Sequence, residues 1–339
     1  QFKNIATENA PSWMDEQIQK DFSPYTDKIT SQKIDELFKT FDPNKNLLVR
    51  FKVVNNVLTM DMPYSDWSGR HSYVKHALEF LVQSKGLPNL DFIVTLHDEI
   101  PESLSNQLPV LTFAKTKSAH GILIPDAEAL AGYERDAALR KEALHTIPWD
   151  QKEKKAFWRG TTTGATYTKE NWHTIPRSQL VLLSLIRPDL IDAKFTKTAQ
   201  CEEGVAEILS ANHMMSHFES IPKHLNYRYL VDVDGNSCTY PRYYWILLSN
   251  SLALKQVSDN VQWFYGALIP FQHFVPLEVD SSDIFEKVKW AREHDAEAKQ
   301  IAANGTEFAS TQLSPENIYL YLYKVLLEYS KHQELPQNP

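Results

Sequence analysis

Cysteine and glycine are scarce in this chain of 339 residues, and long apolar runs are missing. Two cysteines, Cys201 and Cys238, cannot form a disulfide framework in a chain of this size, and they indicate a reducing compartment. The apolar runs at 180–186 and 243–254 are too short or too interrupted to span a membrane. No apolar signal-peptide segment opens the chain. We therefore expect a cytoplasmic protein, and peripheral contact with a membrane stays open.

The ten glycines form no G-x-G-x-x-G fingerprint, and no lysine follows the threonines between Gly160 and Gly164 where a P-loop needs one. The chain also lacks a G-x-S-x-G nucleophile elbow. His213 and His217 have the spacing of a zinc helix, but no glutamate between them could activate water. A satisfied or exposed histidine pair is the better interpretation. These absences argue against a dinucleotide-dependent dehydrogenase, a P-loop NTPase, a serine hydrolase and a zinc protease.

The charge of the chain argues against nucleic acid as a partner. The net charge is −8 at pH 7, and no basic face is evident. The one basic run, Lys152, Lys154 and Lys155, is interrupted by Glu153 and predicts a solvated turn. A chain of 339 residues suits two domains or one large domain, and its hydrophobic fraction of 42% is ample for their cores.

Strand and helix signals alternate along the chain, which predicts α/β sheets in two halves. A hairpin is expected at 47–60 with its turn at Asn55-Asn56. An amphipathic helix follows around 74–81 and ends at Gly86, and 91–96 suits a buried parallel strand. Later strands are expected at 156–160, 229–235 and 251–256, with a helix at 178–186.

Two long helices are expected near the C-terminus. One covers 281–303, with Asp283 and Glu286 at capping-box spacing, and stops at Asn304-Gly305. The last one begins at Ser314-Pro315 and buries a face formed by Ile318, Leu322, Val325 and Tyr329.

Three segments contain candidate functional residues. Asp98 follows the strand at 91–96, at the carboxyl edge where open α/β sheets bind ligands. It could act as a general base if burial tunes it, or it could merely cap the next turn. In 156–184, a hydroxyl-rich loop precedes Arg177 at a helix start. This arrangement suits a diphosphate, or it is a surface loop before the helix-initiating Pro176.

The third segment, 227–256, contains a strand that breaks at Gly235, passes through small polar residues and enters a helix with Arg242. Small residues let the backbone approach a phosphate, and Arg242 could bind it. Asp232 and Asp234 also match the D-x-D pattern that holds a divalent metal in one class of nucleotide-sugar enzymes. Structural roles for both aspartates are the preferred interpretation.

Taken together, these segments resemble glycosyltransferase family 90, which includes the Rumi-type protein O-glucosyltransferases, the fungal capsule xylosyltransferases and bacterial lipopolysaccharide-core enzymes. The likeness extends over roughly 45–332, and it is strongest at FWRG, 187–196, 227–256, 271–305 and 328–332. The resemblance implies a GT-B architecture, with two Rossmann-like domains facing each other across a cleft. The domains would cover 1–150 and 151–311, separated at the polar segment 148–155, and the helix 314–332 would cross back to the first.

The resemblance also implies a UDP-sugar donor and an inverting reaction that uses no metal or other cofactor. Asp98 inherits the role of the catalytic base. The implied donor contacts are Thr161, Arg177, Gly235, Asn236, Ser237, Cys238, Thr239 and Arg242. Three further candidate contacts are His97, Lys115 and Arg159.

Departures from the eukaryotic members determine the acceptor that we expect. Those members are secretory, rich in cysteine and often end in a retention signal, whereas this chain ends in ELPQNP. The segment 126–147 does not resemble the region that grips a folded protein acceptor. We expect a bacterial-type enzyme that transfers glucose or xylose to a glycan or lipid-linked oligosaccharide in lipopolysaccharide or surface-polysaccharide synthesis. Two alternatives stay open: a GT-A transferase with a metal on Asp232 and Asp234, and a non-catalytic glycan-binding relative.

Overall fold

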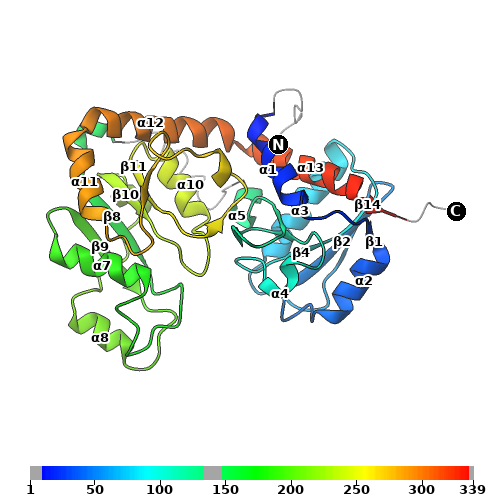
Figure 1. Cartoon of the computed structure of the whole chain (residues 1–339), viewed down its shortest axis with the longest axis horizontal. Coiled ribbons are helices and arrows are strands. Elements are labelled where there is room, and N and C mark those ends of the chain that lie inside the picture. Colours follow the sequence, from blue (N-terminus) through cyan, green and yellow to red (C-terminus); the bar gives the residue numbers. More distant parts are fainter. Residues whose placement is uncertain (1–9, 133–146, 336–339) are drawn as a thin grey trace. The chain divides into compact units, whose positions relative to one another are not determined.

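The computed structural model of the chain describes residues 10–132 and 147–335 (Figure 1). The chain divides into two compact units. The N-terminal unit comprises Gln1–Glu134, Asp259–Ala267 and Leu313–Pro339, and the central unit comprises Arg135–Ser258 and Leu268–Gln312. Each unit is built around its own five-stranded sheet. The prediction that the last helix returns to the first half is confirmed, because that helix belongs to the N-terminal unit.

The sheet of the N-terminal unit begins with the predicted hairpin. Its strands lie in the order β3-β2-β4-β5-β7. Asn55 and Asn56 both adopt positive φ angles, 50° and 61°, which is the geometry of a two-residue hairpin turn and the reason why asparagine is suited to it. The strand bounds are Leu48–Val54 (β2), Val57–Asp61 (β3), Leu90–Thr95 (β4), Leu111–Thr112 (β5) and Ile122–Leu123 (β7).

Strand β4 is the strand expected at 91–96. All six of its residues are buried, as its apolar sequence predicts. It pairs in parallel with β5 on one side but antiparallel with β2 on the other, because the hairpin joins the sheet at this point. The strand ends at Thr95, so Asp98 does follow its carboxyl end.

Helices and short strands cover this sheet. The helices are α1 (Ser12–Phe22), α2 (Ser31–Thr40), α3 (Arg70–Ser84), α4 (Glu102–Ser105), α5 (Ala127–Leu130) and α13 (Pro315–His332). Two short pairs of strands complete the unit: β1 (Ile29–Thr30) with β14 (Gln333–Glu334), and β6 (Lys115–Thr116) with β12 (Asn260–Val261). The 3-10 helix η3 (Tyr265–Ala267) follows β12.

Helix α13 matches its prediction in detail. The side chain of Ser314 accepts a hydrogen bond from the backbone N–H of Asn317, and Pro315 occupies the first helical turn. The predicted apolar face is buried: Ile318, Leu322, Val325 and Tyr329.

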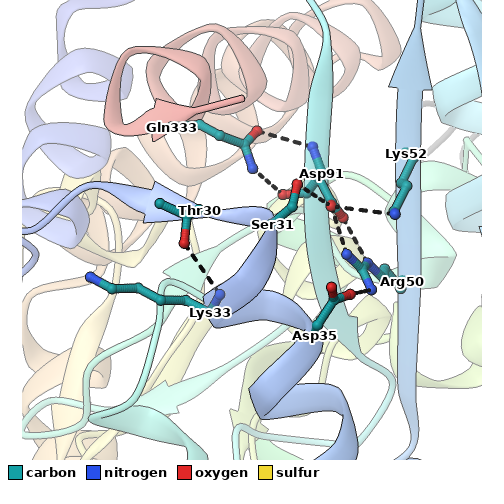
Figure 2. A network of polar contacts seen from close by, with 8 residues as sticks. All are labelled: Thr30, Ser31, Lys33, Asp35, Arg50, Lys52, Asp91 and Gln333. Atoms are coloured by element: carbon teal, nitrogen blue, oxygen red, sulfur yellow. Dashed lines mark hydrogen bonds and ion pairs between the residues drawn. The ribbon is translucent and has the colours of Figure 1, made fainter. Parts of the chain in front are cut away.

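A buried ion-pair network, which the sequence did not suggest, fixes β4 to its neighbours (Figure 2). The guanidinium of Arg50 on β2 donates to both carboxylate oxygens of Asp91 on β4, at 2.8 and 2.7 Å, and also contacts Asp35 on α2. Gln333 of β14 accepts from the backbone N–H of Asp91 at 3.0 Å. The hydrogen bonds that Arg50 donates to these carboxylates raise its pKa despite its burial. The network therefore anchors the strand that leads to Asp98.

The central unit has an all-parallel sheet in the order β13-β11-β10-β8-β9, and its connecting helices make it Rossmann-like. Its strands are β8 (Glu153–Thr161), β9 (Ile191–Lys197), β10 (Tyr227–Asp232), β11 (Leu252–Gln256) and β13 (Val275–Leu277). Its helices are η2 (Trp149–Gln151), α7 (Pro176–Ile186), α8 (Val205–Ala211), α9 (Ile221–His224), α10 (Pro241–Leu248), α11 (Ile284–Glu293) and α12 (Asp295–Gln312).

Three predictions about the helix at 281–303 were wrong. The stretch is divided into α11 and α12 at His294, and α12 continues through Gly305 to Gln312. Gly305 is buried, and a Cβ there would lie 2.9 Å from the carbonyl oxygen of His273, so this glycine permits close packing instead of ending a helix. The capping box does not form, because the Asp283 carboxylate accepts from the backbone N–H of Glu278.

Lys152 also differs from its prediction as part of a solvated turn. Its ammonium is buried and donates to the carbonyl oxygens of Leu225 and Ser249 and to the hydroxyl of Ser251. Burial lowers the pKa of Lys152 to about 8. The predicted exposure does hold for His213 and His217. Across the described residues, no helix combines the length and apolar character needed to cross a membrane.

Candidate active site

The loops that carry the candidate donor residues leave the carboxyl edge of the central sheet side by side. Strand β8 comes first in the chain, β9 lies on one side of it, and β10 lies on the other. The direction of winding therefore reverses between β8 and β10, and ligands of open α/β sheets bind at this kind of switch point. Thr161 ends β8 and Asp232 ends β10. The fold thus brings together two segments that lie about 70 residues apart in the sequence.

Arg177 ties these two loops together. It lies in the first turn of α7 and is only 7% exposed. Its Nε donates to the carbonyl oxygen of Asp234 at 2.8 Å, and Nη2 donates to that of Val233 at 3.2 Å. Its Nη1 donates to the carbonyl oxygen of Thr161 at 2.9 Å and to the hydroxyl of Thr163 at 2.7 Å. These contacts use the guanidinium on protein oxygens, so they favour a positioning role over the direct donor contact that we expected.

Gly235 is required by this close approach of the two loops. A Cβ at this position would lie 2.7 Å from Oγ1 of Thr163 and 3.0 Å from Nη2 of Arg177. On the opposite loop, Gly164 adopts a φ of 105°, and its N–H donates to the side-chain oxygen of Asn236 at 3.2 Å. The absence of side chains at the two glycines lets the β8 and β10 loops pack directly on each other.

Trp158 on β8 forms a platform under the site. Its side chain is fully buried, and the guanidinium carbons of Arg177 and Arg242 lie 5.6 and 5.9 Å from its ring centroid. A Cβ at Gly160 would lie 2.3 Å from the indole ring. The FWRG segment therefore has a physical explanation, because Gly160 provides the space that the Trp158 ring occupies.

Arg242 is a positive group of the site whose guanidinium forms no ion pair with the residues that the structure describes. It lies in the first turn of α10 and is half-buried. Within residues 10–132 and 147–335, its guanidinium makes no hydrogen bond or ion pair with a protein group. Burial lowers the pKa of Arg242, and burial together with the charge of Arg242 lowers the pKa of Arg177 to about 10. Two neighbouring guanidiniums at a helix N-terminus favour an anionic ligand such as a diphosphate.

The D-x-D pair is neutralised from within the protein. The ammonium of Lys255 on β11 lies 2.8 Å from Oδ2 of Asp232 and 3.0 Å from Oδ1 of Asp234. Thr239 donates its hydroxyl to Asp232 at 2.6 Å, and Ser258 donates to Asp234. Burial opposes the charge on Lys255, but the two carboxylates hold its pKa above the ordinary value. These contacts favour structural roles for Asp232 and Asp234, because the ammonium of Lys255 lies between their two carboxylates.

The remaining predicted residues of the β10 loop form a compact turn. The N–H of Gly235 donates to the carbonyl oxygen of Ser237 at 3.0 Å. Ser237 and Cys238 are buried, whereas Asn236 is exposed. Thr161 faces this turn from β8 and is half-buried. The fold therefore gathers the predicted donor residues of the central unit in one place.

Asp98 lies in the N-terminal unit, in the loop after β4. Its Oδ1 lies 2.8 Å from Nη2 of Arg70, whose Nη1 donates to the carbonyl oxygen of Leu96 at 2.8 Å. The side chain of Asp98 is 36% exposed. The carboxylate is therefore partly open to solvent. The ion pair with Arg70 fixes its orientation.

The three further candidate contacts have other partners. Lys115 is bound within the N-terminal unit to the Asp21 carboxylate at 2.7 Å and to the carbonyl oxygen of Gly121 at 2.8 Å. Arg159 forms an ion pair with Asp192 at 2.8 Å. The Nε2 of His97 lies 3.1 Å from the carbonyl oxygen of Lys45. Lys115 and Arg159 therefore each pair with a carboxylate of the protein, and their roles as donor contacts stay predictions.

Sequence reasoning missed several residues that build the site. The sequence shows Trp158 only as part of the FWRG motif and Thr163 only as part of a hydroxyl-rich loop, and it indicates neither of their contacts with Arg177. Lys255 could have been suspected, because a lysine inside an apolar strand needs a buried acidic partner, and Asp232 ends the adjoining strand. Arg70 had no local signal, because its contact with Asp98 spans 28 residues.

A cavity of about 500 Å³ lies elsewhere in the N-terminal unit, between α2 and the segment after α4. Tyr25, Lys33, Glu36 and Asn106 are among its lining residues. It contains none of the predicted site residues, so it does not bear on the assignment of the donor or base positions.

Comparison with known proteins identifies relatives that are named protein O-glucosyltransferases. Human protein O-glucosyltransferase 3 is 32% identical over 334 residues, which is 94% of this chain and 61% of that protein. Human protein O-glucosyltransferase 1 is 25% identical over 331 residues, covering 93% of this chain and 79% of that one. The chain thus spans about three-fifths of the length of the first relative.

Among solved structures, WaaG, a glycosyltransferase involved in lipopolysaccharide biosynthesis, aligns with a TM-score of 0.33 and 12% identity. That alignment covers 61% of this chain and 55% of the other. The sequence profile of "Glycosyl transferase family 90", in contrast, matches residues 6–338. That match covers nearly the whole chain. The protein therefore belongs to glycosyltransferase family 90.

Proposed function

We propose that this chain transfers a sugar from a UDP-sugar to an acceptor hydroxyl, with inversion at the anomeric carbon and without a metal ion. Membership of the family supports the reaction class. The observation that carries the proposal is Arg242, a half-buried guanidinium that forms no ion pair within residues 10–132 and 147–335 and lies against Trp158 at the switch point of the sheet. A diphosphate is an anion of suitable charge for this position.

In the proposed reaction, Asp98 accepts the proton of the acceptor hydroxyl while that oxygen attacks the anomeric carbon of the donor. The bond between this carbon and the UDP oxygen breaks on the opposite face, so the configuration inverts. Arg242 and the backbone N–H groups at the start of α10 stabilise the negative charge that develops on UDP. A base of this kind contributes roughly 10²–10⁴-fold to the rate.

Arg177 has a positioning role in this proposal. Its four hydrogen bonds hold the β8 and β10 loops in a single arrangement. The loop atoms that meet the donor are then fixed before the donor binds, which reduces the entropic cost of binding. Arg242 is left as the guanidinium that contacts the diphosphate.

The identities of the transferred sugar and of the acceptor are further parts of this proposal. Glucose or xylose is our choice of sugar, and the names of the relatives favour glucose. We retain a glycan hydroxyl in surface-polysaccharide or lipopolysaccharide synthesis as the acceptor. The relatives are named protein O-glucosyltransferases, and this makes a polypeptide hydroxyl the second candidate. The segment on which our expectation partly rested, 126–147, lies largely outside the described residues.

The metal-dependent alternative receives less support from the contacts of the D-x-D pair. A divalent ion on Asp232 and Asp234 would have to displace the ammonium of Lys255, which already pairs with both carboxylates. The buried position of that lysine makes such a displacement costly. Metal dependence nevertheless has a direct test in the same experiment that detects donor binding.

Thermal unfolding in the presence of UDP, UDP-glucose and UDP-xylose, with and without EDTA, tests the proposal. Ligand binding to the folded state raises the midpoint of unfolding. We expect UDP to raise it equally with and without EDTA, and at least one UDP-sugar to be hydrolysed or transferred with release of UDP. No stabilisation by any of these nucleotides would contradict the proposal, and binding without turnover would favour a non-catalytic glycan-binding relative.

A further inference from the structure

The loop between β3 and α3 is held rigidly by one buried carboxylate. Asp66 accepts hydrogen bonds from the backbone N–H and the hydroxyl of Ser68, at 2.9 and 2.5 Å. It also accepts from the backbone N–H of His71 at 3.3 Å, and its Oδ2 lies 3.0 Å from Nδ1 of the His71 ring. Burial would raise the pKa of Asp66, but these hydrogen bonds outweigh it and lower the pKa to about 2. Gly69, with a φ of 69°, then leads into the helix.

Trp67 lies at the centre of this loop and points away from the protein. Its side chain is 95% exposed, the highest value among the large hydrophobic residues that the structure describes. The residues on both sides of it, Asp66 and Ser68, are fixed by the hydrogen bonds given above. Exposure of the apolar indole surface to water is unfavourable in the isolated protein. The hydrogen bonds of the neighbouring residues nevertheless hold the backbone of Trp67 in place.

The same loop is joined to the proposed catalytic base. Arg70 follows Trp67 by three residues, and its backbone N–H donates to the hydroxyl of Ser68 at 3.3 Å. Its guanidinium forms the 2.8 Å ion pair with Asp98. Three residues of chain span at most about 10 Å, which limits the distance between the Cα atoms of Trp67 and Arg70. The loop that carries the indole therefore lies close enough to the Arg70–Asp98 pair for a short oligosaccharide to contact both.

We propose that Trp67 is a stacking platform for a pyranose ring of the acceptor, one that places the acceptor hydroxyl beside Asp98. The inference deepens the proposed function and rests on it, because it names a glycan as the acceptor. One face of the indole provides an apolar surface for the C–H groups of a single sugar ring. The polar loop atoms around it suit the hydroxyl groups at the edge of that ring.

The surroundings of Trp67 favour a sugar over a protein surface. A stable protein interface buries roughly 800 Å² on each partner and has several apolar or aromatic residues at its centre. Among the described residues of the N-terminal unit, the other exposed large hydrophobic side chains are Val54 and Val57, at the turn of the β2–β3 hairpin. A single tryptophan in a frame of serine, aspartate and histidine fits one sugar ring better than it fits an apolar protein patch.

The first test observes the tryptophan directly in the full chain. The protein is labelled with 5-fluorotryptophan, and the ¹⁹F resonance of Trp67 is assigned by its loss in Trp67→Phe. Methyl glycosides of glucose, galactose, mannose and xylose are titrated with and without UDP. We expect at least one of them to shift the Trp67 resonance saturably, while the resonance of the buried Trp158 stays in place. If no glycoside moves the Trp67 resonance, the inference is wrong.

A serine-containing polypeptide that carries no sugar serves as the polypeptide probe in the same titration. A shift of the Trp67 resonance by that polypeptide, with none from the glycosides, would overturn the sugar assignment in favour of a protein acceptor. The effect of UDP on the midpoint of unfolding is measured on the same sample. Stabilisation by UDP without any glycoside effect would refute the role of Trp67 alone, whereas no stabilisation by UDP would refute the proposed function.

Kinetics with the most effective glycoside provide the second test. Trp67→Ala should raise the acceptor KM about tenfold, the scale of one lost aromatic contact, while the donor KM and the midpoint of unfolding stay unchanged. Trp67→Tyr should recover most of the affinity because it retains an aromatic face. Phe218→Ala is the matched control, since Phe218 is 79% exposed in the central unit and should be neutral. An unchanged acceptor KM in Trp67→Ala would contradict the inference.

Discussion

The Nε of Arg177 donates a hydrogen bond to the carbonyl oxygen of Asp234 at 2.8 Å, and this bond connects the start of α7 to the loop after β10. The same guanidinium reaches Thr161 and Thr163 on the loop after β8. Arg242 lies over the same tryptophan ring but has no such contacts among the described residues. The two arginines therefore have separable roles, one in holding the loops and the other in binding the donor.

Replacement of Arg177 by lysine should destabilise the protein. Lysine cannot reach four acceptors in the geometry of a guanidinium, so buried carbonyl groups lose their partners. We expect the free energy of unfolding to fall by about 2–4 kcal/mol and UDP affinity to fall with it. Denaturant unfolding and calorimetric titration measure the two quantities. Native stability in Arg177→Lys would show that these hydrogen bonds do not hold the loops.

Arg242→Ala should have the opposite pattern. Removal of a charge-assisted contact with the diphosphate should weaken UDP binding by roughly 10–100-fold, which corresponds to about 1.5–3 kcal/mol. Stability should stay the same or rise, because the variant relieves the repulsion between two neighbouring guanidiniums. The control is Arg187→Ala, whose side chain pairs with Asp189 away from the donor site. Unchanged UDP affinity in Arg242→Ala would remove this residue from the donor site.

Chelation should not affect transfer. The ammonium of Lys255 already pairs with Asp232 and Asp234, so we expect the same kcat and the same donor KM with EDTA as with added manganese. Lys255→Met should lower the free energy of unfolding by about 3–5 kcal/mol, since it leaves two buried carboxylates without a cation. Loss of transfer in EDTA, restored by manganese, would instead support a metal bound at this pair.

His224 predicts how stability depends on pH. It is 5% exposed and packs against Phe157 and Trp245. Burial, and secondarily the charge of Arg242, lowers its pKa from 6.5 to about 3. Below pH 6.5 the unfolded chain therefore binds a proton that the folded chain refuses, and stability falls as the pH decreases towards 3. This residue should account for a loss of about 3 kcal/mol between neutral pH and pH 4.

His224→Gln is the corresponding control for that titration. The variant has no titrating group at this position, so the difference between its stability and that of the wild type should shrink as the pH falls from 7 to 4. Urea unfolding at several pH values measures this difference. Parallel curves for the two proteins would show that His224 is not held neutral by the fold.

Local sequence patterns predicted the secondary structure well where one signal dominated. The Asn55-Asn56 turn, the cap at Ser314 and the buried strand β4 follow from backbone preferences and periodicity alone. Asn304-Gly305 failed as a helix stop, because tertiary packing against His273 explains that glycine. Local propensity is overridden where packing against a neighbouring element determines which residue fits a position.

The candidate site was predictable in its residues but not in their partners. Gly235 and Arg242 have recognisable local signals, namely a glycine after a strand and an arginine at a helix start. The contacts of Arg177 span 14 to 57 residues, and the pairing of Lys255 with Asp232 depends on which strands lie side by side. Sequence spacing does not contain that information, so the distinction between positioning and binding arginines required the fold.

The central claim is that Asp98 acts as the base in a reaction whose donor binds elsewhere in the chain. Asp98→Asn removes the basic oxygen but keeps the size of the side chain. The most direct measurement compares transfer and UDP affinity in Asp98→Asn with those in Asp27→Asn, an exposed aspartate of the same unit. The account predicts that transfer falls by about 10²–10⁴-fold in Asp98→Asn while UDP affinity stays native. Near-native transfer by Asp98→Asn would contradict it.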